Sequence, residues 1–227
     1  MVVYSGAMKT VIITGISRGL GGAIAKKFLD GGYFVIGTST SGKAEFPREG
    51  LQVVALDLSE PQSIKAAVGA IREIAKEVDI LVNNAGVLLE REDEYDITIE
   101  KLRKTLEVNL IGTIDFTEQL LPNLVKGGHI VNVSSASGSL TDSLEDPDAP
   151  AYRISKAALN MYTKVLAERL KRQEIIVSSV HPGWVQTDMG GKNAPRSPKE
   201  PAEEIYTLAV SPVETGQFWY KGKKRDW

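Results

Sequence analysis

Short apolar runs recur along the chain and alternate with longer amphipathic stretches. Most of the runs are rich in Val and Ile and are apolar without strict alternation, which is typical of strands covered on both faces. We therefore expect a buried strand at each run: KTVIIT (9–14), YFVIGT (33–38), LQVVAL (51–56), DILVN (79–83), GHIVNVS (128–134), IIVSSVH (175–181) and GQFWY (216–220).

The amphipathic stretches between these runs have the length of helices. They lie at 19–30, 61–76, 98–125, 151–172 and 200–210. SEPQS (59–63) supplies an N-cap serine and an early proline for the second of them. A strand followed by a helix, repeated along the chain, predicts parallel strands with helices on both faces. The expected fold class is α/β, a doubly wound, Rossmann-type domain whose seven-stranded parallel sheet is flanked by helices.

Three charged stretches are predicted to be surface loops, because the alternation resumes after each: EREDEYD (90–96), SLEDPDAP (143–150) and KNAPRSPKEP (192–201). We expect a single domain over residues 1–227, with residues 1–8 as a short N-terminal extension. The basic segment KGKKRDW (221–227) is predicted to be a solvated tail.

The overall composition narrows the classes of function. A formal net charge of -2 gives no reason to expect nucleic acid or an anionic membrane as a partner. The absence of cysteine excludes disulfides, thiolate catalysis and cysteine-based zinc sites. No apolar run approaches the roughly 20 residues that span a bilayer, and the N-terminus is unlike a signal peptide, so we expect a cytoplasmic protein. His129 and His181 lack ligand-spaced partners, so no metal site is expected.

The loop after the first predicted strand, TGISRGLGGAIA (14–25), carries Gly15, Gly19 and Gly21. Glycine permits a tight turn and a close approach of the backbone to a ligand, and a helix N-terminus offers N–H groups to a pyrophosphate. The spacing is T-G-x-x-x-G-x-G and differs from the general dinucleotide fingerprint G-x-G-x-x-G. A phosphate cradle and a turn that merely closes the strand onto the helix both stay open at this point.

The segment YRISK (152–156) places a tyrosine and a lysine four residues apart, on one face of a predicted helix. An ammonium group near a phenol favours the phenolate and lowers its pKa, which suits general acid/base catalysis at neutral pH. The motif alone leaves open the alternative of a surface pair without a chemical role.

These two motifs resemble those of the short-chain dehydrogenase/reductase family, and the resemblance runs from about residue 9 to residue 220. It is carried further by LDLS (56–59), NNAG (83–86), EVNLIG (107–112), VNVSSASG (131–138) and HPGWVQTDM (181–189). The last of these, with the C-terminal segment, is most similar to the carbonyl-reductase branch. The resemblance implies an oxidoreductase with a nicotinamide cofactor.

The resemblance also implies a role for each matching residue. Tyr152 would exchange a proton with the substrate oxygen, Lys156 would lower the pKa of Tyr152 and hold the ribose hydroxyls, and Ser135 would hydrogen-bond the substrate oxygen. Asn109 would support a water that links Lys156 to solvent. The residues implied in cofactor binding are Gly15, Ser17, Arg18, Gly19, Leu20, Gly21, Thr38, Ser39, Asp57, Leu58, Asn84, Ala85, Gly86, Tyr152, Lys156, Pro182, Gly183, Val185 and Thr187.

The loop after the second predicted strand bears on which nicotinamide is bound. In NAD enzymes that strand normally ends on an acid that pairs with the adenosine 2′-hydroxyl. Here no acid follows until Glu45; residues 38–41 read TSTS, Lys43 is nearby, and Arg18 can face the same position. Hydroxyls and a guanidinium without a carboxylate suit a 2′-phosphate, so we expect NADP(H) rather than NAD(H). The alternative is that Arg18 is a solvated loop charge.

The expected substrate is a small carbonyl compound or the corresponding alcohol. Trp184 and Met189, beside Leu88 and Leu89, are candidates for the pocket wall, although packing against the core is the commoner fate of such side chains. An acidic insertion, TDSLEDPDAP (141–150), is expected to overhang the site.

Two other functions stay open. One is a different reaction of the same family, such as reduction of a 3-oxoacyl group on a carrier protein. The other is a nucleotide-sensing binding protein, although such proteins commonly lack the proton-transfer residues. No nucleic acid and no membrane is expected as a partner. We expect assembly into a homodimer or homotetramer through the helices at 98–125 and 151–172.

Overall fold

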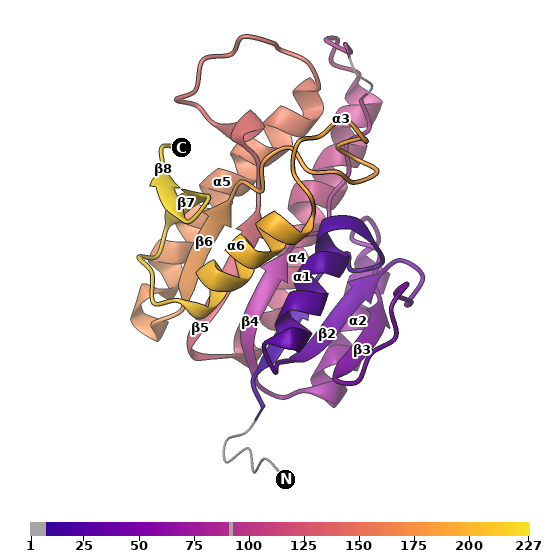
Figure 1. The fold of residues 1–227 in the computed structure, drawn as a ribbon, viewed down its shortest axis with the longest axis vertical. Helices are drawn as coiled ribbons and strands as arrows, with labels where there is room; N and C mark the ends of the chain where they lie inside the picture. Colours follow the sequence, from indigo (N-terminus) through magenta and orange to yellow (C-terminus); the bar gives the residue numbers. More distant parts are fainter. Residues whose placement is uncertain (1–7, 91–92) are drawn as a thin grey trace.

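A computed structural model describes residues 8–90 and 93–227 (Figure 1). One sheet runs through this part of the chain, with the strand order β3-β2-β1-β4-β5-β6-β7-β8. The strands are β1 (Thr10–Ile13), β2 (Phe34–Ser39), β3 (Leu51–Ala55), β4 (Val78–Asn83), β5 (Leu124–Val133), β6 (Ile176–Val180), β7 (Gln217–Tyr220) and β8 (Lys223–Arg225). Of the predicted extension at residues 1–8, only Met8 lies within the described residues.

The seven predicted strands are all confirmed, with ends that shift by a few residues. β1 to β7 pair in parallel, as expected of a doubly wound sheet. The expected total of seven was wrong, because the segment predicted to be a solvated tail forms β8, which pairs antiparallel with β7. Lys221 and Gly222 join the two strands with φ of 49° and 72°, and two positive φ values are what a tight two-residue hairpin turn requires.

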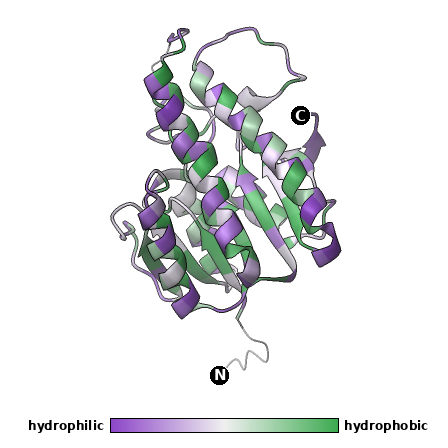
Figure 2. Ribbon diagram, turned by 180° about the vertical axis from the view of Figure 1, so that it is seen from behind, coloured by the Kyte–Doolittle hydropathy of each residue, from purple (hydrophilic) through white to green (hydrophobic). Residues whose placement is uncertain are grey.

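Helices cover both faces of the sheet, as predicted (Figure 1). They are α1 (Gly19–Asp30), α2 (Pro61–Ile74), α3 (Ile99–Leu106), α4 (Thr113–Leu120), α5 (Pro150–Leu170) and α6 (Lys199–Val210). α1 and α6 share a buried core with Val11 and Ile13 of β1, whereas α2, α4 and α5 share a second core with Ile12. Seen from behind, the helices carry mixed hydrophilic and hydrophobic residues and the strands are mainly hydrophobic (Figure 2). None of the helices among the described residues has the length and hydropathy to cross a membrane.

The helix predicted over residues 98–125 is wrong as a single element. α3 is followed by a π-helical turn, Glu107–Gly112, then by α4, a 3₁₀ turn at Leu121–Asn123 and the start of β5. Gly112 packs against the backbone of Leu58, where an added Cβ would lie 1.9 Å from the carbonyl oxygen. Such π-helical turns occur frequently at functional sites, and this one contains Asn109.

The acidic insertion forms the large loop at the top of Figure 1 and is tied to the C-terminal strand. The backbone carbonyl of Trp227 accepts hydrogen bonds from the N–H groups of Leu140 and Thr141, at 2.9 and 3.0 Å. Arg225 of β8 pairs with Asp142. The insertion is therefore held at its first residues.

His129 makes the stability of the fold depend on pH. Its ring is buried between the carbonyl of Ala209 and the hydroxyl of Ser178, and burial lowers its pKa from 6.5 to about 4. Unfolding exposes the ring, so the unfolded chain binds the proton more tightly between pH 6.5 and 4, and stability falls as the pH is lowered through that window. Between pH 7 and pH 4.5 we expect this residue to cost roughly 2–3 kcal/mol of the free energy of unfolding.

Urea unfolding of the wild type and of His129→Gln at both pH values measures this contribution. Other groups also titrate in the window, so the difference between the two proteins is the informative quantity. The variant should lose less stability on acidification than the wild type. Equal losses would show that His129 has the same pKa in the folded and unfolded chains.

Candidate active site

The loops after β1 and β4 meet where the winding of the sheet reverses. From β1 the chain continues to β2 and β3 on one side, and β4 pairs with the other side of β1. At such a point the loops diverge and leave a crevice beyond the carboxyl ends of the strands. Here the two loops are also joined, because the N–H groups of Asn84 and Ala85 donate to Oγ1 of Thr14, at 3.0 and 2.9 Å.

The glycines after β1 make a turn without side chains at the start of α1. Gly15 and Gly19 have φ of 74° and 58°, which other residues rarely adopt. A Cβ on Gly21 would lie 2.1 Å from the carbonyl oxygen of Gly15 and 2.5 Å from Nδ2 of Asn84. The backbone is therefore free to approach a ligand at the N-terminus of α1, and this cradle fits the pyrophosphate of a dinucleotide.

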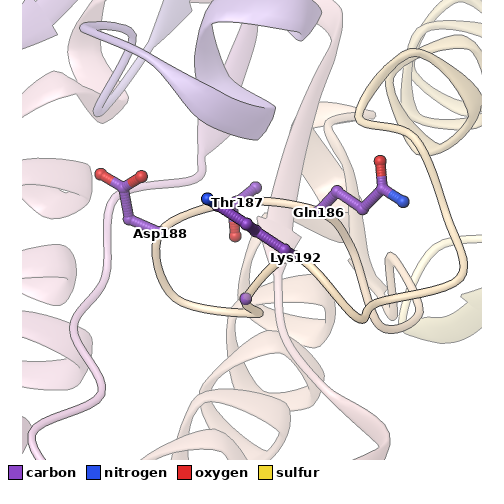
Figure 3. A pocket seen from close by; sticks show the side chains of 5 residues that line it. Gln186, Thr187, Asp188 and Lys192 are labelled. Atoms are coloured by element: carbon purple, nitrogen blue, oxygen red, sulfur yellow. The ribbon is translucent and has the colours of Figure 1, made fainter.

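The loop after β6 lies against this glycine turn. A Cβ on Gly19 would lie 3.3 Å from Cγ2 of Thr187. Residues of the loop line a pocket of about 300 Å³, in which Asp188 and Gln186 point to opposite sides (Figure 3). The lining residues are Gln186, Thr187, Asp188, Gly191 and Lys192.

Arg18, expected to face the 2′ position of the adenosine, pairs with Asp188 across the two loops. Nε of Arg18 lies 2.5 Å from the carboxylate, and the two side chains are 63% and 74% exposed. An ion pair this exposed contributes at most about 1 kcal/mol, so a phosphate can displace the carboxylate. The sequence did not predict this partner.

Arg196 fixes the loop after β6 at its base. Its guanidinium donates to the carbonyl of Pro182 at 2.7 Å and pairs with Glu204 of α6. Backbone bonds join Gln186 to Arg196 and Arg196 to Trp184. The predicted cofactor residues Pro182, Gly183 and Val185 belong to this anchored segment.

Tyr152, Lys156 and Ser135 lie together at the carboxyl end of β5. Tyr152 is in the first turn of α5, and Nζ of Lys156 lies 5.5 Å from the centre of its ring. The same ammonium group donates to the carbonyl of Val133 at 2.9 Å. The side chain of Ser135 interacts with the Tyr152 hydroxyl, whereas the hydroxyl of Ser134 donates to the backbone carbonyl of Lys156.

The pKa values of this pair are set mainly by burial. Burial raises the pKa of Tyr152 above 10, opposed by its hydrogen bond with Ser135, and lowers the pKa of Lys156 from 10.5 to about 8. In the protein by itself the pKa of Tyr152 is therefore raised and not lowered as expected, because burial is the larger effect.

Asn109 connects the segment after β4 to α5. Its Oδ1 accepts from the N–H of Val87 at 2.7 Å, and its Nδ2 donates to the carbonyl of Val87 at 2.8 Å and to Oγ of Ser155 at 3.1 Å. A Cβ on Gly86 would lie 3.2 Å from Oδ1 of Asn109 and 3.7 Å from Nζ of Lys156. The four predicted catalytic residues therefore surround one region of the crevice.

The hydroxyls of Thr38 and Ser39, at the end of β2, are less available than expected. Thr38 and Ser39 are buried, and Oγ of Ser39 bonds to the N–H and the carbonyl of Lys43. Asp57, after β3, accepts from the N–H and hydroxyl of Ser59, and these bonds lower the pKa of its carboxyl. Ser17 and Leu20 flank Arg18 and Gly19 in the turn, and Leu58 is buried.

Two large side chains on the loop after β6, those of Trp184 and Met189, are exposed. Trp184 is 57% and Met189 is 44% exposed, so neither packs against the core, and Leu89 is also exposed. Glu90, predicted to lie in a surface loop, is buried. Among residues 8–90 and 93–227, no group of three or more His, Cys, Asp or Glu side chains is arranged to hold a metal ion.

Known proteins match the chain along most of its length. The family model described as short chain dehydrogenase matches residues 9–197. Oxidoreductase UcpA from Salmonella typhimurium is 34% identical, and the match covers 92% of this chain and 85% of UcpA. Carbonyl reductase 1 (NADPH) from Oryctolagus cuniculus is 28% identical over 96% of this chain and 98% of its own. The crystal structure of NADPH-bound carbonyl reductase from chicken fatty liver has a TM-score of 0.87, with 27% identity and coverage of 97% and 99%.

Proposed function

We propose that this chain, which belongs to the short-chain dehydrogenase family and lies close to its carbonyl reductases, transfers hydride between NADP(H) and a carbonyl or alcohol substrate. One observation carries the proposal. The phenol of Tyr152, with Ser135 beside it and Lys156 over its ring, lies in the same crevice as a glycine cradle in which a side chain would clash.

In the proposed reaction, the protein holds the substrate oxygen and moves one proton. A bound nicotinamide supplies the hydride that adds to the carbonyl carbon. Ser135 donates a hydrogen bond to the oxygen where negative charge develops, and Tyr152 gives that oxygen its proton. Lys156 would hold a ribose hydroxyl and, as the phenol loses its proton, stabilise the phenolate with its positive charge. The reverse sequence oxidises an alcohol.

The cradle after β1, Asp57 and the loop around Thr187 are the parts that would hold the cofactor. The glycine turn would take the pyrophosphate, Asp57 the adenine, and Thr187 the nicotinamide amide. Asn109 would support the site indirectly by fixing Val87 and Ser155.

Purified protein mixed with NADPH and a panel of ketones, aldehydes and quinones tests the proposal. Loss of absorbance at the nicotinamide band that depends on both the protein and a carbonyl compound is the expected result. Tight binding of NADPH without turnover on any member of the panel would favour the nucleotide-sensing function instead. Turnover confined to carrier-bound 3-oxoacyl groups would assign the other reaction.

The choice of NADP(H) over NAD(H) rests on Arg18. In the proposed complex the 2′-phosphate replaces the Asp188 carboxylate on the exposed guanidinium. Arg18→Ala should therefore raise the KM for NADPH about tenfold, because a charge-assisted bond is lost, and leave the KM for NADH within twofold. Steady-state kinetics with both cofactors measures the two effects.

Asp188→Asn is the matched variant on the other side of the ion pair. It removes the competing carboxylate and should lower the KM for NADPH while leaving that for NADH unchanged. If the KM values for NADPH and NADH changed equally in either variant, Arg18 would not be the residue that binds the 2′-phosphate.

We also propose that the chain forms a homodimer or a homotetramer through the helical segment at 98–125, which runs from α3 to α4, and the helix at 151–172, which is α5. Four large apolar side chains stay exposed on the π-helical turn before α4 and on α5: Ile111, Ile154, Met161 and Val165. Three of them recur on α5 at intervals of seven and four residues, which places them on one face of the helix.

A further inference from the structure

The helix that carries Tyr152 begins without a cap of its own. The residue before its first turn is Ala149, with φ of 49°, and Pro150 follows. Alanine has no side-chain acceptor, whereas helices usually begin at Ser, Thr, Asp or Asn. The first N–H groups of α5 must therefore find partners elsewhere in the protein.

A carboxylate from the loop after β4 provides that partner. Oε1 of Glu90 accepts hydrogen bonds from the N–H groups of Ala151 and Tyr152, at 2.6 and 3.2 Å. These residues are 61 and 62 positions away along the chain. A negative charge at a helix N-terminus is favourable, and bonds to an ionised acceptor are stronger than neutral ones.

The burial of Glu90 makes this arrangement costly in free energy. The residue is 8% exposed, and among the described residues its Oε2 has no hydrogen-bond partner. A buried carboxylate with one unpaired oxygen costs free energy.

The same loop is fixed at two further points. Val87 is held on both of its backbone groups by Asn109, and the carbonyl of Glu94 accepts from the N–H of Ala149 at 3.0 Å. The backbone of Tyr152 and the segment that carries Leu88 and Leu89 are thus joined through Glu90, and that segment is in turn bonded to Asn109.

We infer that Glu90 is a positioning residue for the reaction, one that fixes the backbone of Tyr152 relative to the segment carrying Leu88 and Leu89. The inference rests on the proposed function for its kinetic consequence, but the capping geometry itself does not. A displacement of a catalytic group by about 1 Å can cost about 100-fold in rate. Glu90 therefore acts on the rate of the chemical step through Tyr152.

Kinetics of three variants test this role. In Glu90→Ala, kcat should fall about 10- to 100-fold while the Kd for NADPH stays within twofold, because the cofactor cradle is elsewhere. Glu90→Gln keeps an acceptor oxygen at the same reach and should recover most of kcat. Asp96→Ala, which removes an exposed carboxylate on the same loop, should leave kcat unchanged. An unchanged kcat in Glu90→Ala, or an equal loss in Glu90→Gln, overturns the inference.

Amide hydrogen exchange separates this inference from the proposed function. The N–H groups of Ala151 and Tyr152 should exchange at least about tenfold faster in Glu90→Ala, while Leu159 and Leu166 in the middle of α5 stay protected. If the wild type reduces no carbonyl compound, the proposed function fails and exchange still decides the role of Glu90. Exchange at wild-type rates overturns that role whatever the activity. If Glu90→Ala does not fold, Glu90→Asp, one methylene shorter, replaces it with the same criteria.

Discussion

Replacing Tyr152 with phenylalanine is expected to lower kcat/KM for carbonyl reduction by about 1000-fold, because the variant has no proton to give to the substrate oxygen. The ring and its contact with Lys156 are retained. Binding of NADPH should therefore change little, and the loss should fall on kcat. Initial rates of NADPH oxidation, together with a fluorescence titration of the cofactor, measure both quantities.

Tyr162→Phe is the matched control for this substitution. Tyr162 lies on the same helix, and its hydroxyl donates to Glu118 at 3.1 Å, away from Ser135 and Lys156. That variant should keep its kcat/KM within about threefold, although it loses a hydrogen bond worth about 1 kcal/mol of stability. If Tyr152→Phe is as active as Tyr162→Phe, the proposed acid is a different group.

Gly21→Ala should raise the Kd for NADPH by roughly 10- to 100-fold. The added methyl group would lie 2.1 Å from the carbonyl oxygen of Gly15 and 2.5 Å from Nδ2 of Asn84, so the turn must open to admit it. Overpacking of this kind costs about 1–3 kcal/mol, and a turn that has moved no longer presents its N–H groups to the phosphates. Cofactor titration gives the affinity, and thermal unfolding gives the accompanying loss of stability.

Gly69→Ala controls for the effect of adding a methyl group to a helical glycine. Gly69 lies in α2, and a Cβ there would have no atom within 4 Å beyond the neighbouring backbone of its own helix. This variant should bind NADPH as the wild type does and gain up to about 1 kcal/mol of stability. Equal affinities in the two variants would mean that the glycine turn does not hold the cofactor.

The apolar runs predicted the fold well because most of the strands are buried on both faces. Val11, Ile12 and Ile13 are all inaccessible to solvent, so each position in β1 must be apolar and the strand is visible in the sequence. β8 gave no such signal, since Lys223, Lys224 and Arg225 are a charged strand on the edge of the sheet. β8 pairs with β7 through the two-residue turn at Lys221 and Gly222, which the prediction of a solvated tail overlooked.

The interrupted helix at 98–125 shows a different limit. The residues from Ile99 to Leu120 are helical throughout, so the spacing of apolar residues predicts one long helix. The π-helical turn arises where Gly112 meets the backbone of Leu58, and a contact between segments this far apart is not encoded in local spacing.

The site was predictable where a motif carries its own chemistry. The glycine turn and the Tyr152–Lys156 pair were predicted from their spacing together with the resemblance to the family. In the structure Nζ of Lys156 lies over the ring of Tyr152 and 3.7 Å from where a Cβ on Gly86 would be, in the segment that the glycine turn contacts. The role of Glu90 could not be predicted from a motif, because the residue belongs to a charged stretch that was predicted to be a surface loop. The missing cap at Ala149 was the available signal, since a helix that begins on alanine requires an acceptor from elsewhere.

The pKa values illustrate what spacing does not convey. Four residues of separation place the ammonium group of Lys156 over the ring of Tyr152. Burial then dominates both groups, raising the pKa of Tyr152 and lowering that of Lys156 to about 8.

The short antiparallel strand at the end of the chain also limits how copies can join. An open strand edge offers unpaired N–H and C=O groups to any neighbouring molecule, and lysines on such an edge discourage that pairing. β8 covers the edge of β7 and presents Lys223 to solvent, while Lys224 pairs with Glu214, so the edge offered to a second copy is a charged one. Edge-to-edge pairing of the sheets of two molecules is thereby disfavoured at β8. Assembly into fibres by pairing at this edge is disfavoured for the same reason.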